Sequence, residues 1–203
     1  MVAPYHHGNL REELLRQGVA LAREKGEAGV VVREAARNAG VSHNAAYRHF
    51  KDRDALLIAV AKVGMAEMAA RMRENAAKAV RGTPQEKAKA RLRAIGRAYV
   101  EFALSEPGLF SVAFSGAAAG QPEQVEEAVA GPFQLLTEAL DGMVEAGVTT
   151  PERRENAEML CWPAVHGFAA LHLEGPLVMS TKAERDEALE DMLDKVQRSI
   201  IQE

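Results

Sequence analysis

Residues 41–50, VSHNAAYRHF, carry many hydrogen-bonding side chains for what is expected to be a short helix. Helical spacing places four polar residues on one face of that helix: His43, Asn44, Tyr47 and Arg48. Side chains of these types can hydrogen-bond both to phosphate oxygens and to the edges of nucleic-acid bases. A helix that only packed against its neighbours would not need them, so this face is a candidate nucleic-acid contact.

Each of these side chains suits a different contact. Asn44 can pair with adenine through two hydrogen bonds, and Arg48 can pair with guanine or with a phosphate. Tyr47 carries its hydroxyl on a rigid stem, which suits a phosphate oxygen. His49 is expected to face partly inward, so a packing role is as reasonable for it as DNA contact. The alternative for the whole set is an ordinary polar surface on a small helical hairpin.

Two short helices are expected to position this face, one over residues 33–39 and the other from residue 42 to about residue 50. Gly40 lies between them and can adopt the positive φ that a sharp turn needs. The Ser42 hydroxyl can cap the second helix. Arg33 begins the first helix, where its charge and the amide dipoles can hold a DNA backbone. The pattern predicts a helix-turn-helix.

The rest of the chain is also predicted to be helical. Apolar residues make up 47% of the 203 residues and charged residues 27%, which is typical of a folded chain with a polar surface. Alanine, leucine, glutamate and arginine dominate, and strand-like alternation is absent. The expected fold class is all-α. We expect a helix-turn-helix domain over residues 1–53, a connecting helix over 54–81 and a C-terminal helical domain over 82–203.

Charge is distributed unevenly along the chain. Residues 1–81 contain 14 Lys and Arg against 9 Asp and Glu, whereas residues 82–203 contain 11 against 20. A basic first part suits contact with a polyanion, although an asymmetry of this size also arises by chance. No stretch is apolar enough for a membrane helix or a signal peptide, so we expect a cytoplasmic protein with no membrane partner.

The sequence offers no metal, cofactor or catalytic site. Cys161 is the single cysteine, so the chain can form no internal disulfide, which favours a reducing compartment. Around one helix, Cys161 and His166 diverge by ~140° and His166 and His172 by ~120°, so one ion cannot take all three. A Ser-His-Asp order and a phosphate-binding glycine loop are both absent. We therefore expect no enzyme activity, no metal and no cofactor.

The stretch LCWPAVHGFAALHLEGPL, residues 160–177, is apolar on two faces. A helix of this kind must be buried on two sides, one against its own domain and the other against a second subunit. Pro163 lacks the backbone N–H of the helical pattern and is expected to kink the helix. The candidate dimer interface combines this helix with the last one: Leu160, Ala164, Phe168, Leu171, Leu189, Leu193 and Val196.

Trp162 and His166 lie one turn apart beside Pro163, and together they offer a large apolar surface with one polar group. This combination suits a cavity for a mostly apolar ligand. The candidate lining residues are Phe102, Phe110, Phe114, Met143, Met159, Trp162 and His166. Acidic residues are scarce here, which favours a neutral or weakly acidic ligand over a cation. The alternative is that all seven are simply core residues.

The run VREAARNAGVSHNAAYRHFKDRDALL, after a first helix that follows HHGNL, resembles the DNA-binding domain of the TetR/AcrR (tetracycline-repressor-like) regulators. The resemblance covers the chain from His7 to about Ala61, and the all-helical body has the family's length. Residues 160–177 also resemble, over a shorter match, a Trp-His-Gly signature of one branch. The sequence departs from the family pattern at Val31, Ala35 and Ala46, which puts the capping of the 33–39 helix in question.

The resemblance implies a function and a set of contacts. It implies DNA contacts at Arg33, Ser42, His43, Asn44, Tyr47, His49 and Lys51, to which the face described above adds Arg48. It further implies a homodimeric, ligand-responsive regulator, most simply a repressor, that binds a near-palindromic double-stranded operator. Residues 82–203 would then bind a small apolar or weakly acidic effector and form the dimer. Two alternatives are a ligand-independent helix-turn-helix DNA binder and an α-helical enzyme acting on the apolar ligand.

Overall fold

The computed structural model describes residues 10–79, 81–115 and 122–201, and every regular element within these ranges is an α-helix. The all-α fold class is therefore confirmed. The described residues divide into two compact units, the first made of residues 10–65, 106–115 and 122–128 and the second of residues 66–79, 81–105 and 129–201. None of the helices in the described ranges is both long enough and apolar enough to cross a membrane.

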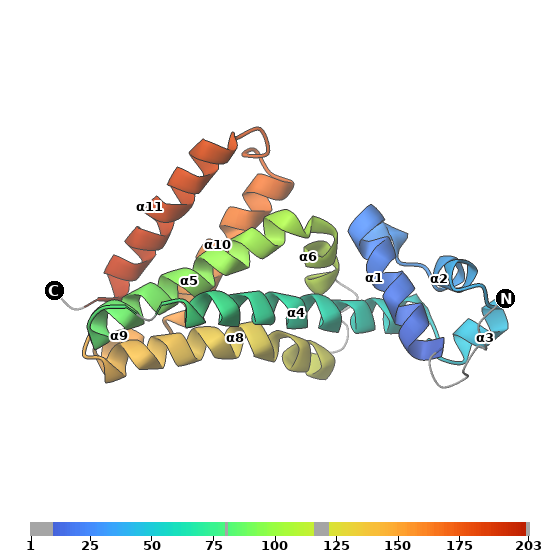
Figure 1. Ribbon diagram of the computed structural model, residues 1–203, viewed down its shortest axis with the longest axis horizontal. Coiled ribbons are helices and arrows are strands. Elements are labelled where there is room, and N and C mark those ends of the chain that lie inside the picture. Colours follow the sequence, from blue (N-terminus) through green and yellow to red (C-terminus); the bar gives the residue numbers. More distant parts are fainter. Residues whose placement is uncertain (1–9, 80, 116–121, 202–203) are drawn as a thin grey trace. The chain divides into compact units, whose positions relative to one another are not determined.

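The first unit is built around the N-terminal helices (Figure 1). It contains α1 (Leu10–Gly29), α2 (Val32–Asn38), α3 (His43–Tyr47), the beginning of α4 (Arg53–Ala77), and α6 (Pro107–Ala113). Its core includes the fully buried side chains of Leu14, Leu21, Phe50, Leu56 and Leu57. The helix-turn-helix therefore rests on a hydrophobic core formed by helices on either side of it in the sequence.

Helix α6 packs directly on α1 although more than seventy residues separate them in the sequence. A Cβ atom at Gly108 would lie only 2.0 Å from the backbone oxygen of Ala22, so the two backbones meet where no side chain fits. Beside this contact, Arg23 Nε donates to Glu106 Oε2 at 3.0 Å. Packing thus places α6 with the N-terminal helices, while the boundaries predicted at residues 53 and 81 stay predictions.

The second unit contains the remaining part of α4 with five further helices (Figure 1). These are α5 (Pro84–Ser105), α8 (Pro122–Glu145, from residue 129), α9 (Pro151–Arg154), α10 (Glu158–Leu173) and α11 (Lys182–Ile200). Helices α5, α10 and α11 pack against one another. Thr181 and Glu184 form a reciprocal capping box that begins α11. The core of this unit includes Ile95, Phe102, Leu140 and Met143.

Residues 151–173 form two helices instead of one continuous helix. Helix α9 ends at Arg154, and α10 begins at Glu158. Between them Asn156 adopts a φ of 56°, a left-handed conformation that asparagine tolerates better than most residues. Arg154 stabilises the junction between α9 and α10, because its side chain pairs with Asp141 and with Glu158, both at 2.7 Å. Helix α10 then contains Pro163 in its interior and continues as one helix to Leu173.

Candidate nucleic-acid interface and ligand cavity

The turn between α2 and α3 has the hydrogen bonds of a Schellman motif. Gly40 has a φ of 69°, the amide of Val41 donates to Ala36 O at 3.0 Å, and the amide of Gly40 donates to Arg37 O at 3.2 Å. Ser42 then caps α3, with its Oγ accepting from the Ala45 amide at 3.2 Å. Val31, which precedes α2, makes no side-chain cap, as its residue type suggested.

All eight side chains proposed for DNA contact are exposed. They are Arg33, Ser42, His43, Asn44, Tyr47, Arg48, His49 and Lys51. The opposite side of α3 is buried, with Ala46 fully covered and Phe50 only 2% exposed. The expectation that His49 turns inward was wrong. Helix α3 ends at Tyr47 instead of continuing to Phe50, so His49 no longer follows the helical spacing that would bury it.

Contacts behind α3 hold the exposed face in place. The Arg11 guanidinium lies 5.1 Å from the centre of the Phe50 ring, which forms the inner side of this segment. Arg53, at the start of α4, donates to the backbone oxygens of Val30 at 3.0 Å and Glu27 at 2.6 Å. These hydrogen bonds join the end of α1, which precedes the helix-turn-helix, to the start of α4, which follows it. A short polar helix presented on such a rigid support can meet the groove of a duplex.

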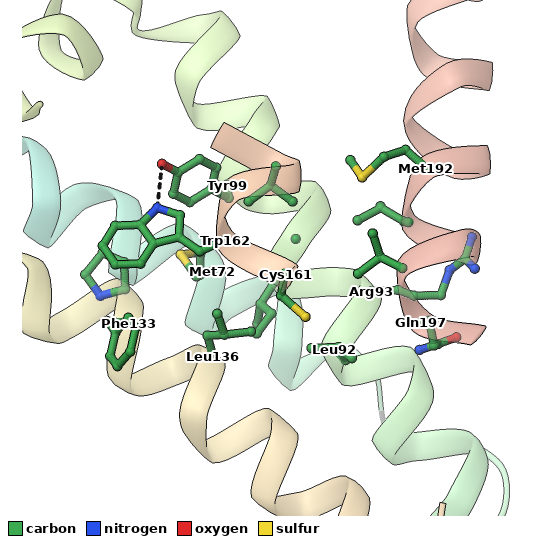
Figure 2. Close-up of a pocket in the computed structure, with 16 residues that line it drawn as sticks. Met72, Leu92, Arg93, Tyr99, Phe133, Leu136, Cys161, Trp162, Met192 and Gln197 are labelled. Atoms are coloured by element: carbon green, nitrogen blue, oxygen red, sulfur yellow. Dashed lines mark hydrogen bonds between the residues drawn. The ribbon is translucent and has the colours of Figure 1, made fainter. Parts of the chain in front are cut away.

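The second unit contains an apolar cavity bounded by residues of α4, α5, α8, α10 and α11 (Figure 2). The cavity has a volume of about 50 Å³, and the whole space between the lining atoms, including the part open to solvent, is about 590 Å³. In this state the cavity has room for only a few water molecules. The lining residues are Met72, Leu92, Arg93, Ile95, Gly96, Tyr99, Pro132, Phe133, Leu136, Cys161, Trp162, Val165, Met192, Leu193, Val196 and Gln197.

Of the seven residues predicted to line a cavity, only Trp162 does so. Phe110 and Phe114 belong to the first unit, where their rings pack together at 4.9 Å, because α6 binds α1. Met159 is 71% exposed. Phe102 and Met143 are fully buried core residues, and His166 lies behind Tyr99, so these three do not line the cavity either.

Tyr99 links Trp162 to His166. Trp162 Nε1 donates to the Tyr99 hydroxyl at 3.3 Å, and that hydroxyl lies 2.9 Å from His166 Nδ1 (Figure 2 shows the first bond). Burial lowers the pKa of His166 and raises that of Tyr99. At neutral pH the imidazole is therefore uncharged and the phenol protonated, so this hydrogen bond joins two neutral groups. The polar group in the cavity wall is therefore the Tyr99 hydroxyl, and His166, which was predicted for this position, is hydrogen-bonded to it.

The predicted interface residues of α11 also require correction. Leu193 and Val196 line the cavity, and Leu189 and Leu193 are each only 6% exposed within the single chain. The close approach of α11 to α5 explains this, because a Cβ atom at Gly96 would lie 2.8 Å from Leu193 Cδ2. The α10 residues of the predicted interface differ, since Leu160 and Leu171 are each 44% exposed, Phe168 is half-buried and Ala164 is partly exposed.

Ion pairs that were not predicted from the sequence join α5 to α11 beside the cavity. Arg93 contacts Glu190 Oε2 at 2.9 Å and Asp194 Oδ1 at 3.3 Å, and Arg97 Nε donates to Glu190 Oε1 at 2.7 Å. The sequence does contain a pattern that indicates these ion pairs, because Arg93 and Arg97 are four residues apart, as are Glu190 and Asp194. Such spacing places each pair on one face of its helix, ready to meet an opposite charge.

The first unit thus has the form of a helix-turn-helix DNA-binding domain, and the second is a helical domain that encloses an apolar cavity. The chain belongs to the tetracycline-repressor-like (TetR) family of transcription regulators. Residues 14–60 match the bacterial regulatory proteins of the tetR family. Residues 92–196 match the tetracyclin repressor-like C-terminal domain. The resemblance to the TetR/AcrR family inferred from the sequence is confirmed, while the Trp-His-Gly branch stays a prediction.

Solved structures similar to this chain include one from Rhodococcus sp. RHA1, a protein of unknown function that is 32% identical. The match covers 99% of this chain and all of that chain, with a TM-score of 0.81. A TetR family transcription regulator from Marinobacter aquaeolei VT8 is 18% identical, with 97% of each chain covered and a TM-score of 0.66. The regulator FadR from Bacillus subtilis, in complex with stearoyl-CoA, is 16% identical, with 93% of this chain and 98% of that chain covered and a TM-score of 0.67. No curated protein sequence matches the chain.

Proposed function

We propose that this protein is a homodimeric repressor that binds a near-palindromic operator and is released from it by a small apolar or weakly acidic molecule. The observation that carries the proposal is the pairing of two features in one chain. The first unit exposes the polar face of α3, and the second contains an apolar cavity with Trp162 and Tyr99 in its wall. Ligand pockets share this mixture of apolar lining and few polar groups.

In the proposed complex α3 lies in the major groove. Asn44 and Arg48 are placed to read base edges, while Tyr47 and Lys51 contact phosphates. Arg33 approaches the backbone from the start of α2. A single short helix reads too few base pairs to be selective, so two copies bind half-sites whose centres lie about 34–36 Å apart.

Substitutions on this face should separate base reading from phosphate contact. Tyr47→Phe and Lys51→Ala are each expected to weaken binding to every sequence by about 1 kcal/mol through loss of a phosphate contact. Asn44→Ala should instead relax the preference at one base pair per half-site. Selection of binding sites from random duplex DNA measures both effects, and Lys182→Ala, an exposed change in the second unit, serves as the control. An unchanged selected site for Asn44→Ala would contradict its base-reading role.

The proposed dimer uses the apolar side of α10 that its own protomer leaves uncovered. Leu160, Leu171 and Met159 are exposed, and Ala164 and Phe168 keep part of their surface accessible, so apolar side chains face solvent along the helix. Apolar surface that extends along a helix in this way is typical of an interaction site. Because Leu189, Leu193 and Val196 face their own protomer, they are left out of the proposed interface.

Leu160→Glu or Leu171→Glu is expected to convert the dimer into monomers. Each change would place an unpaired carboxylate in an apolar interface, at an expected loss of several kcal/mol, about 3–5. Sedimentation velocity at micromolar protein measures the change. Ala90→Glu, which adds the same charge at an exposed position of α5, should leave the dimer intact. Intact dimers in both α10 variants would place the interface elsewhere.

An effector releases the operator only if it binds the DNA-bound conformation less tightly than it binds another conformation. In that other conformation the two recognition helices no longer match the separation of the half-sites. The Bacillus subtilis FadR structure contains stearoyl-CoA, which makes a cavity ligand reasonable for a similar fold. The cavity of this protein has room for a few water molecules, so an effector must also widen it. Trp162, the single tryptophan, lies in the cavity wall and would report that event by its fluorescence.

A further inference from the structure

The lining of the cavity indicates the chemical class of effector, an inference that rests on the proposed function. We propose that the cavity takes uncharged apolar molecules and discriminates against carboxylates of the same size and shape, which narrows the effector class of the proposed function to molecules that are uncharged at neutral pH. The reason is that Arg93, the one charged side chain among its lining residues in the described structure, is already neutralised by acidic residues of α11.

Arg93 has its acceptors in place. Its Nη2 donates to Glu190 Oε2 at 2.9 Å and approaches the Glu190 backbone oxygen at 3.4 Å, while its Nη1 donates to Asp194 Oδ1 at 3.3 Å. Figure 2 shows the guanidinium against α11. Arg97 pairs with the same Glu190 carboxylate, and Arg198 Nε pairs with the Asp194 carboxylate at 2.8 Å, so each of the two anions is shared between two cations. Because both terminal nitrogens of Arg93 already donate to these carboxylates, an acid in the cavity would have to compete with them for Arg93.

The other polar side chains of the lining are also engaged or neutral. Trp162 donates to the Tyr99 hydroxyl, which is also hydrogen-bonded to His166 Nδ1. Gln197 Nε2 donates to the backbone oxygen of Lys89 at 2.7 Å. Burial raises the pKa of the Cys161 thiol to about 12, so this group is uncharged at neutral pH. The remaining lining is formed by apolar side chains and Gly96.

A carboxylate entering this cavity would lose its hydration without gaining a free cation. It could pair with Arg93 only by displacing Glu190 or Asp194, which would leave one of those carboxylates without its partner. An uncharged molecule of the same shape meets no such penalty and gains the burial of its apolar surface. The ion pairs between α5 and α11 thus disfavour anionic ligands in the cavity, in addition to joining the two helices.

Pairs of primary amides and carboxylic acids test this directly, because the two head groups have the same shape and differ in charge at neutral pH. We would titrate the full-length protein with hexanamide, octanamide and decanamide, and with the matching hexanoate, octanoate and decanoate, following Trp162 fluorescence. The expected result is that at least one amide binds with a dissociation constant at least about tenfold lower than that of its acid.

A charge-removing variant tests the stated cause. In Glu190→Gln/Asp194→Asn, Arg93 loses both anionic partners, so the ratio of acid to amide affinity should shift toward the acid by at least about tenfold. The control Asp186→Asn/Asp191→Asn removes two carboxylates of α11 that pair with Lys182 and Lys195 instead, and should leave the ratio unchanged. The comparison of amides and acids on the unaltered protein stands even if the first variant folds poorly.

Equal or tighter binding of the acids to the unaltered protein would overturn the inference and leave the ligand-responsive function standing. If no member of either series changes Trp162 fluorescence up to its solubility limit, the inference is also overturned. In that case the selection of operator DNA, which needs no effector, separately decides whether the DNA-binding part of the proposed function survives.

Discussion

Gly108→Ala is expected to lower the free energy of unfolding by about 3 kcal/mol. The added Cβ would lie 2.0 Å from the Ala22 backbone oxygen and 2.9 Å from its carbonyl carbon. Neither atom belongs to a side chain that could rotate away, so α6 must shift from α1 and lose its packing. Urea denaturation followed by circular dichroism measures the change.

The matched control is the same substitution at Gly142 in α8, where a Cβ would meet no heavy atom within 4 Å. There alanine should be neutral or stabilise the helix by about 0.5–1 kcal/mol, because glycine has the greater conformational freedom in the unfolded chain. Equal effects of the two substitutions would mean that α6 does not pack on α1 as described.

Phe102→Ala is expected to lower the free energy of unfolding by about 3–5 kcal/mol. The ring is fully buried in the second unit, and the Arg71 guanidinium lies 5.0 Å from its centre. Removal of the ring leaves a void that the surrounding helices cannot fill. The same denaturation measurement applies, and the result decides between a core residue and the cavity residue that the sequence suggested.

Phe133→Ala is the control for that prediction, since it removes the same ring from the cavity wall, where Phe133 is 38% exposed and packs against Trp162 at 5.4 Å. We expect a loss below about 1.5 kcal/mol together with a change in Trp162 fluorescence. If Phe102→Ala were as mild as Phe133→Ala, the assignment of Phe102 to the core would be wrong.

The helix-turn-helix could be predicted from the sequence because its determinants are local. Gly40 and Ser42 define the turn and the cap within three residues, and helical spacing separates the exposed face of α3 from buried Ala46 and Phe50. The prediction failed for His49, where the exact end of the helix decides the direction of the side chain. Helix ends depend on contacts that spacing alone does not reveal.

The cavity was predicted far less well because its walls come from helices distant in the sequence. Trp162 was identified from its own helix, whereas Tyr99, Phe133 and Leu136 come from α5 and α8. Phe110 is an apolar aromatic residue like Phe133, yet the close contact of Gly108 in α6 with Ala22 in α1 holds it in the other unit. Apolar residues that line a cavity and those that fill a core share the same sequence pattern.

One titration tests most directly whether occupancy of the cavity controls DNA binding. A labelled operator duplex, obtained by selection, is mixed with the full-length protein and titrated with octanamide, while DNA anisotropy and Trp162 emission are recorded on the same samples. We predict that anisotropy falls over the same range of ligand concentration as the Trp162 signal changes. A Trp162 signal that saturates while the operator stays bound with unchanged affinity would contradict it.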